Sequence, residues 1–386
     1  MSRLFTSGFE GFNLTSIGWT ATAGTAPTIT TTTPHSGTYV LETAATAAQS
    51  NVRADLVTSI AAGKYTWTRF YFRGADVTPG TNTIIARSTS SGAVVAWTVT
   101  LNTDGTLTLT NGVTSTTASI TTALANDTWY RILVYHFIDN TAGQLNLWLY
   151  LGNSTTELDR TPDITGEDTL PANVGRWYFG KLSAVAGTYL YDDIAIVDDV
   201  AGNGETGTDP GPGNTYLAVP NFDGTPAQWT PSTGSDHYAV INDLPGTPND
   251  TAYLSTAVTS NEDWFYLTSA PAAMPANAII KCVDVSARAH GNATTPDMRV
   301  AFYDGTTRTD GPTATLTTSA AALTMRQHLV VRPTGHTKTN AASYSIAIES
   351  LSSLDTRVTA LWINVEWIES SVPVASPVTH KVLMTA

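Results

Sequence analysis

Aspartate side chains cluster near the middle of the chain, where Asp192 and Asp193 are adjacent and Asp198 follows shortly after. Clustered carboxylates are ligands that Ca²⁺ prefers, so these residues are the candidates for a calcium site. A calcium-binding loop also spaces its oxygen ligands regularly, and no such spacing surrounds these aspartates. We therefore favour a structural role, in which one aspartate caps a turn and the others face water.

Aromatic side chains offer a second kind of chemistry, because their ring faces can stack on sugars. Trp97, Trp148 and Tyr150 are the candidates, since each falls on a predicted strand whose opposite face we interpret as aliphatic. Aromatic residues of a β-sandwich also pack in its core or on a sheet face. Both interpretations stay open for these three residues, and glycan binding there is a hypothesis.

Catalytic groups are harder to find in this sequence. Glycoside hydrolysis needs two carboxyl groups that face each other across a cleft, yet Glu10, Glu42 and Glu366 are isolated from one another. The seven histidines include no HxH or HExxH spacing, so no zinc site is indicated. His237 is interpreted as a loop partner of the adjacent Asp236 rather than as part of a catalytic dyad. We predict no catalytic residues and no enzymatic activity.

The composition predicts an all-β protein without a nucleic-acid partner. The 386 residues carry 19 Lys and Arg against 32 Asp and Glu, for a net charge of −13. Phosphate binding needs clustered cationic side chains, which this balance does not favour. Charged residues make up only 13% of the chain, and small or β-branched polar residues that suit strands and turns replace them. The single cysteine, Cys282, lies in an apolar run and is expected in a buried strand.

Alternation along the chain predicts the strands. Residues 144–151 alternate leucine with polar or aromatic side chains, which is the period of a strand with one buried face. Asp104-Gly105 and Asn111-Gly112 indicate hairpin turns, because these pairs tolerate positive φ. The predicted strands are 38–42, 64–73, 83–87, 93–101, 106–110, 127–137, 144–151, 174–180, 190–199, 278–289, 297–304, 323–332, 342–350 and 358–368.

Two antiparallel β-sandwich domains of jelly-roll type follow from these strands, over residues 1–198 and 215–370. Residues 199–214 are rich in Gly and Pro without an apolar period, so we expect a linker there. Residues 371–386 are expected to form an extended tail that docks on a neighbouring subunit. The start of the chain has no apolar leader and no run reaches the length of a membrane span, so neither secretion nor membrane insertion is expected.

A series of motifs in the first half appears in a recognisable order: DTWYRI at 127–132, a hairpin with a Leu-rich partner, WYFG at 177–180 and YDDIAI at 191–196. This order resembles the laminin-G/concanavalin-A-like jelly roll over residues 1–198. The resemblance does not decide the calcium question, because many relatives have no metal. Glucanase relatives carry a Glu-x-Asp-x-x-Glu strand that is absent here, so a glycan hydrolase is the least favoured alternative.

A second series follows the predicted linker: PNFDGTPAQWTP at 220–231, SDHYAVIND at 235–243, PNDTAYL at 248–254 and NEDWFYL at 261–267. It resembles the region after the jelly roll in tailed-bacteriophage virion structural proteins. The resemblance implies a non-enzymatic minor tail, fibre or capsid-decoration component, located in the virion and held by contacts with other virion proteins. It also implies a homo-oligomer, such as a trimer, and adhesion to host-surface glycans as an added role. A carbohydrate-binding adhesin module is the alternative.

Overall fold

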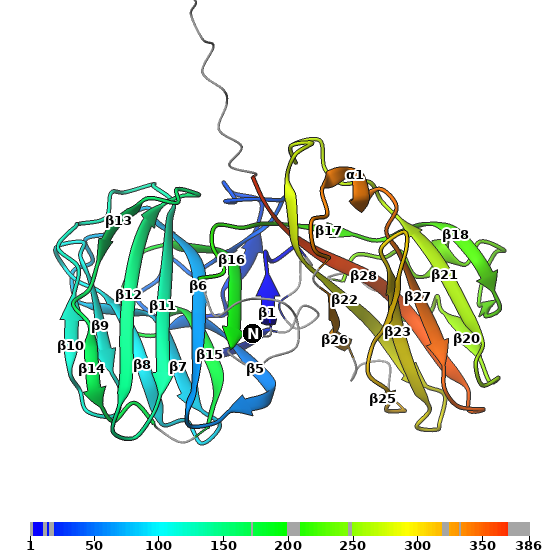
Figure 1. Ribbon diagram of the computed structural model, residues 1–386, viewed down its shortest axis with the longest axis horizontal. Coiled ribbons are helices and arrows are strands. Elements are labelled where there is room, and N and C mark those ends of the chain that lie inside the picture. Colours follow the sequence, from blue (N-terminus) through cyan, green and yellow to red (C-terminus); the bar gives the residue numbers. More distant parts are fainter. Residues whose placement is uncertain are drawn as a thin grey trace, which may run out of the picture.

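Two β-sandwiches lie side by side, one formed by the first half of the chain and one by the second (Figure 1). The computed structural model describes residues 3–10, 14, 19–170, 173–198, 209–245, 249–318, 324–331 and 333–369. Each sandwich consists of two antiparallel sheets, so the predicted all-β fold class is confirmed. Within the described ranges, no helix is long and apolar enough to cross a membrane.

One sheet of the first sandwich is built around β6 (Lys64–Gly74), which lies between β11 (Tyr130–Ile138) and β16 (Tyr189–Asp198). The order is β13-β12-β11-β6-β16-β4-β3, with β14 beside β12 and β1 beside β16. The remaining strands are β1 (Arg3–Ser7), β3 (Thr28–Thr30), β4 (Val40–Glu42), β12 (Gly143–Leu151), β13 (Glu157–Arg160) and β14 (Ile164–Glu167).

The opposing sheet has the order β10-β9-β8-β7-β15-β5-β2. Its strands are β2 (Trp19–Gly24), β5 (Ser50–Ile60), β7 (Thr83–Ser90), β8 (Val95–Leu101), β9 (Leu107–Asn111), β10 (Thr117–Ser119) and β15 (Val174–Lys181).

Alternating side chains of the central strands fill the space between these two sheets. Phe70 and Phe72 of β6 point into the core, where Trp177 and Phe179 of β15 meet them. The rings of Phe70 and Phe179 lie 5.2 Å apart in an edge-to-face arrangement. Trp177 Nε1 donates to Thr68 Oγ1 at 2.9 Å, so the polar atom of this buried indole is satisfied.

The second sandwich pairs a sheet of order β19-β20-β28-β22-β26, with β17 beside β28, against one of order β18-β21-β27-β23-β24, with β25 beside β23. The strands of the first are β17 (Asn214–Ala218), β19 (Thr230–Pro231), β20 (Leu254–Thr256), β22 (Ile279–Gly291), β26 (Thr324–Val331) and β28 (Thr356–Ile368). Those of the second are β18 (Pro220–Ala227), β21 (Glu262–Leu267), β23 (Asp297–Tyr303), β24 (Arg308–Asp310), β25 (Ala314–Thr315) and β27 (Ser345–Ser350).

The core of the second sandwich is separate from that of the first. Phe265, Phe302 and Ile346 enter it from one sheet, and Val285 and Ile363 enter it from the other. Cys282 is buried in β22, as expected. The short helix α1 (Lys338–Ala341) precedes β27 at one end of the sandwich.

A polar interface joins the two sandwiches. Arg69 of β6 and Glu366 of β28 form an ion pair at 2.8 Å between Nη1 and Oε1, and both side chains are fully buried. Asp193 Oδ1 of β16 accepts from Thr215 Oγ1 of β17 at 2.7 Å. Because each contact links a strand of one sandwich to a strand of the other, the two units are fixed by specific hydrogen bonds as well as by the chain.

The predicted strands are present with shifts of a few residues at their ends. The strands that were not predicted are the long β5 and the shorter β1, β2, β3, β10, β13, β14, β17, β18, β19, β20, β21, β24 and β25. The domain boundaries stay predictions, because residues 199–208 of the expected linker and the expected tail at 371–386 lie outside the described residues. β17 begins at Asn214, the last residue of the predicted linker.

Candidate functional site: an aromatic hollow on the second sandwich

The candidate site lies on the outer face of the sheet that contains β18, β21, β27, β23 and β24. Side chains alternate along β21, so Phe265 is buried in the core while Trp264 and Tyr266 point outward. Tyr266 is 54% exposed, which is far more than packing on a sheet face requires. Three consecutive aromatic residues thus place side chains on both faces of one strand.

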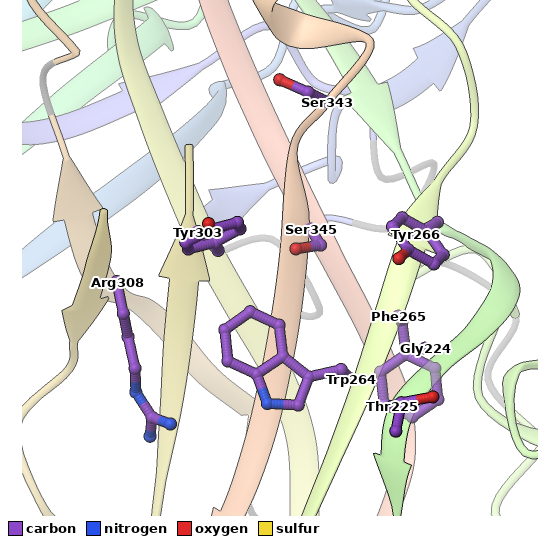
Figure 2. A pocket seen from close by; sticks show the side chains of 9 residues that line it. All are labelled: Gly224, Thr225, Trp264, Phe265, Tyr266, Tyr303, Arg308, Ser343 and Ser345. Carbon is purple, nitrogen blue, oxygen red and sulfur yellow. The ribbon is translucent and has the colours of Figure 1, made fainter. Parts of the chain in front are cut away.

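The strand register places small residues beside the indole. Trp264 is paired with Ala347 of β27, which is in turn paired with Ala301 of β23. Directly paired residues share one face of a sheet, so both alanines belong to the outer face. They are nevertheless fully buried. We infer that the indole, which extends from β21 across β27 in Figure 2, covers them.

A hollow of about 360 Å³ lies beside the indole, with Tyr303 on one side and Tyr266 on the other (Figure 2). Ser345 is paired with both tyrosines and lies between them. The rings of Trp264 and Tyr303 are 5.6 Å apart and nearly perpendicular, at 83°. The hollow therefore has aromatic walls with a hydroxyl between them. Its remaining lining residues are Gly224, Thr225, Phe265, Arg308 and Ser343.

Gly224 allows β18 to approach the site closely. A Cβ atom at this position would lie 2.9 Å from Trp264 Cβ, a separation that real Cβ atoms do not show. The absence of a side chain at Gly224 therefore lets β18 pass beside the indole and bring Thr225 to the edge of the hollow.

A network of ion pairs borders the hollow. Arg308 of β24 contacts the carboxylates of Glu262 at 2.6 Å, Glu349 at 2.7 Å and Asp310 at 2.5 Å. Arg299 also contacts Glu349, at 2.8 Å. Partial burial works to lower the pKa of Arg308, but the hydrogen bond to Asp310 and the charges of these carboxylates outweigh it, so the pKa is raised. The guanidinium is thus neutralised by the protein itself while its Cζ lies 5.6 Å from the Trp264 ring centre.

Asp263 anchors the neighbouring loop to β21 from the opposite face. Its carboxylate accepts from the backbone N–H of Trp229 at 2.8 Å and lies 2.5 Å from His237 Nδ1. Burial raises the pKa of Asp263 above its usual value. The expectation that His237 pairs with Asp236 was wrong, because the fold brings Asp263 to the imidazole instead.

The structure corrects the sequence prediction for Trp97. Its side chain is fully buried in the first core, where Val99 and Leu101 point the same way along β8. The face opposite Trp97 carries Thr98 and Thr100, so the assumption of an aliphatic opposite face failed. Trp97 is a core residue and cannot stack on a glycan.

Trp148 and Tyr150 lie on the outer face of the first sandwich, because Leu145, Leu147 and Leu149 of β12 fill its core. Trp148 packs against Trp67 with ring centres 5.4 Å apart. The guanidinium of Arg131 lies 3.8 Å from the centre of the Tyr150 ring and covers one of its faces. Glycan binding at these two residues stays a prediction, and their rings pack on protein groups rather than enclosing a hollow.

The three candidate metal ligands are not brought together. Asp192 and Asp193 are fully buried and Asp198 is nearly so, so the expectation that aspartates here face water was wrong. Asp193 accepts from Ser36 Oγ at 2.8 Å and Thr215 Oγ1 at 2.7 Å. Asp198 lies opposite Thr66 near the other end of β16, five positions along β6 from the partner of Asp192, or about 16 Å away. No group of three or more metal-ligating side chains occurs among the residues that the structure describes.

Trp264, Tyr266, Tyr303 and Arg308 were not among the candidate site residues named from the sequence, although the motif at 261–267 contains the first two. Trp264 and Tyr266 are two positions apart, which is the spacing of residues on one face of a strand. This spacing was the signal in the sequence that could have indicated a shared aromatic surface. Tyr303 and Arg308 join them only because β23 and β24 follow β27 in the sheet order. That order cannot be deduced from the local pattern of any one strand.

No protein-family model matches the sequence, and no curated protein matches it. Among solved structures, the chain is similar to an alginate lyase from Aplysia kurodai (8% identity, TM-score 0.39, covering 51% of this chain and 99% of that one). It is also similar to the basic winged bean lectin (12%, 0.36, 51% and 98%) and to lectin II from Ulex europaeus (13%, 0.35, 52% and 100%). At these TM-scores the likeness carries no information about what this chain binds.

Proposed function

We propose that this chain is a non-enzymatic carbohydrate-binding protein and that the hollow beside Trp264 takes a neutral sugar. The observation that carries the proposal is the arrangement of Trp264, Tyr266 and Tyr303 around Ser345. The C–H face of a sugar ring stacks on aromatic rings, and its hydroxyl groups need hydrogen-bonding partners at the edges. Ser345, Ser343 and Thr225 supply hydroxyls at the hollow.

The charges around the hollow favour a neutral ligand. Arg308 is shared among Glu262, Glu349 and Asp310, so its positive charge is already balanced. The two arginines and three carboxylates of the network leave a net negative charge at this border. Phosphate, sulfate and sugar carboxylates would meet repulsion there, and the chain as a whole carries a charge of −13.

The same network argues for binding without hydrolysis. Glu262 and Glu349 are paired across β21 and β27, which places two carboxyl groups close together on this face. A glycosidase needs one such group protonated as a general acid and the other free to act. Here each carboxylate holds Arg308 in an ion pair, of 2.6 and 2.7 Å, which supports a structural role for the two glutamates.

Binding of the full chain to an array of neutral and acidic glycans tests this proposal. We expect neutral glycans to bind, sialylated, uronic and sulfated glycans to be rejected, and bound oligosaccharides to be recovered uncut. Trp264→Ala should weaken binding about tenfold or more, because it removes the main stacking surface. Trp129→Ala is the matched control, since it removes a partly exposed indole of the first sandwich that belongs to neither candidate glycan site. Equal loss in both variants, or binding of acidic glycans alone, would contradict the proposal.

The setting we propose for this binding is the surface of a phage virion, where the chain assembles with other virion proteins as a homo-oligomer. The support is the resemblance of residues 220–267 to virion structural proteins, a range that includes Trp264 and Tyr266 of the hollow. Mass spectrometry of purified particles tests the setting. If the protein is missing from particles of a phage that encodes it, the setting is wrong, and the glycan-binding proposal is unaffected.

A further inference from the structure

Aromatic side chains continue beyond the hollow toward the edge of the sheet. Phe222 of β18 is paired directly with Tyr266 of β21, so the two rings stand on the same face. Phe222 is 62% exposed and Tyr266 is 54% exposed. Large apolar side chains with that exposure are unusual when they occur next to each other on a soluble domain, and they indicate a binding surface.

The ring of Phe222 is supported from one side. Its centre lies 6.1 Å from that of Tyr238, which begins the 3-10 helix η1 (Tyr238–Val240) in the loop after β19. The backbone N–H groups of His237 and Tyr238 donate to the carboxylate of Asp223 at 2.9 and 2.6 Å. The loop is therefore tied to the residue next to Phe222, and the exposed ring is held in place before any ligand arrives.

The register sets the length of this aromatic row. Tyr303, Ser345, Tyr266 and Phe222 are paired in turn across four adjacent strands, β23, β27, β21 and β18. Three strand spacings of about 4.8 Å separate the first residue from the last, or about 14 Å in all. A single sugar ring cannot reach from the hollow to Phe222, whereas a chain of several sugars can.

We propose that the ligand is a linear, neutral oligosaccharide that lies across the strands, with one sugar in the hollow and later sugars over Tyr266 and Phe222. This inference rests on the proposed function and adds the chain length and direction of the ligand. The hydroxyls between the rings fit a sugar chain better than an apolar protein surface, because a protein partner would leave Ser345 and Thr225 without partners.

The test measures affinity by calorimetry for glucose-, mannose- and galactose-based series, from the monosaccharide to the hexasaccharide. The full chain should bind one series with an affinity that rises with length. Phe222→Ala should lose about tenfold in affinity for the longest members and leave the shortest members unchanged. Trp264→Ala should lose affinity at every length. Far-ultraviolet circular dichroism checks folding, which Phe222→Ala should leave intact because the side chain is mostly exposed.

The outcomes separate the two proposals. Affinity that does not depend on length, or a Phe222→Ala variant with wild-type affinity for every member, overturns the extended row and leaves the glycan site at Trp264 standing. A wild-type chain that binds no member of any series overturns the proposed function, and the extended row with it.

Discussion

Three buried carboxyl groups meet where the two sandwiches touch. Glu10 accepts from the backbone N–H groups of Thr38 and Tyr39 at 3.0 and 3.1 Å, and it lies close enough to Asp193 for the two charges to repel. Burial raises the pKa of Glu10 to about 8, and repulsion by Asp193 adds to this. Burial likewise raises the pKa of Asp192 well above its usual value, with Asp193 and Glu10 adding to the effect.

The nearby positive groups do not cancel this carboxyl cluster. The imidazole of His35 lies 2.7 Å from Asp193. Arg69 directs Nε and Nη2 to the backbone carbonyl of Asp193, at 3.1 and 3.0 Å, and its Nη1 to Glu366. The raised pKa values of Glu10 and Asp192 therefore follow from burial with few counter-charges, and they give this interface a dependence on pH.

Glu10→Gln should flatten the dependence of stability on pH. The folded protein holds the Glu10 proton up to a pKa of about 8, whereas the unfolded chain releases it near 4.5. The folded state therefore binds more protons between these values, and the free energy of unfolding falls as pH rises, by up to about 1.4 kcal/mol per unit. Glutamine keeps an acceptor for Thr38 and Tyr39 without the charge. Urea unfolding from pH 5 to pH 9 measures the slope, and identical slopes in the two proteins would contradict the assignment.

At the scale of elements, a buried lysine fixes the end of β15. Lys181 is fully buried, and its Nζ donates to the backbone carbonyls of Ala44, Thr46 and Val185, the last two at 2.8 and 2.9 Å. One ammonium group thus satisfies three carbonyl oxygens from two loops that connect strands of opposite sheets. These loops have few strand hydrogen bonds of their own, so Lys181 holds them together.

Lys181→Met should lower the free energy of unfolding by about 2–4 kcal/mol, because it removes the buried ammonium that joins the two loops and takes the donor from the buried carbonyl of Val185. Lys338 is the matched control, since its Nζ donates to the carbonyls of Pro271, Ala272 and Met274 while the residue is only partly buried. Water can replace the ammonium there, so Lys338→Met should cost less. Guanidinium unfolding of both variants tests this order, and an equal or reversed order would be evidence against it.

Local pattern was enough to predict the strands that alternate strongly. Leucine at every second position predicts β12 correctly. Aromatic residues on both faces of the alternating segment 64–73 predict β6. β5 was missed although Val52, Ala54 and Leu56 alternate with charged residues in its sequence, SNVRADLVTSI, because this period covers only five residues. Its formation depends on pairing with β15 and β2 on either side, which is tertiary information.

The candidate site could not be predicted from the alternation within single strands. Phe222, Tyr266, Tyr303 and Ser345 span more than 120 residues of sequence and form one row only through the order β18-β21-β27-β23. Trp97 was misassigned because a half-buried strand presents an aromatic residue in the same two-residue period whether its face is inside or outside. Periodicity identifies the two faces, and only packing decides which of them is buried.

At the scale of the whole molecule, two separate hydrophobic cores are connected through polar contacts. The cores share no residue, and the contacts between sandwiches include the ion pair of Arg69 with Glu366 and the hydrogen bond of Thr215 to Asp193. Specific, fully desolvated polar contacts fix one orientation more strictly than apolar contacts do, because a displaced partner leaves a buried charge unpaired. The orientation of the two sandwiches should therefore depend on a few residues.

Glu366→Ala should uncouple the unfolding of the two sandwiches. The variant removes the carboxylate from a fully buried ion pair, and removing one partner of such a pair costs about 3–5 kcal/mol. Scanning calorimetry of the full chain should then show a lower first transition that is separated from the second. The double variant Arg69→Met/Glu366→Met removes both charges together and should recover most of the loss, since replacing a buried ion pair by apolar groups is often neutral. If Glu366→Ala unfolds in the same transition and at the same temperature as the wild type, the ion pair does not couple the sandwiches.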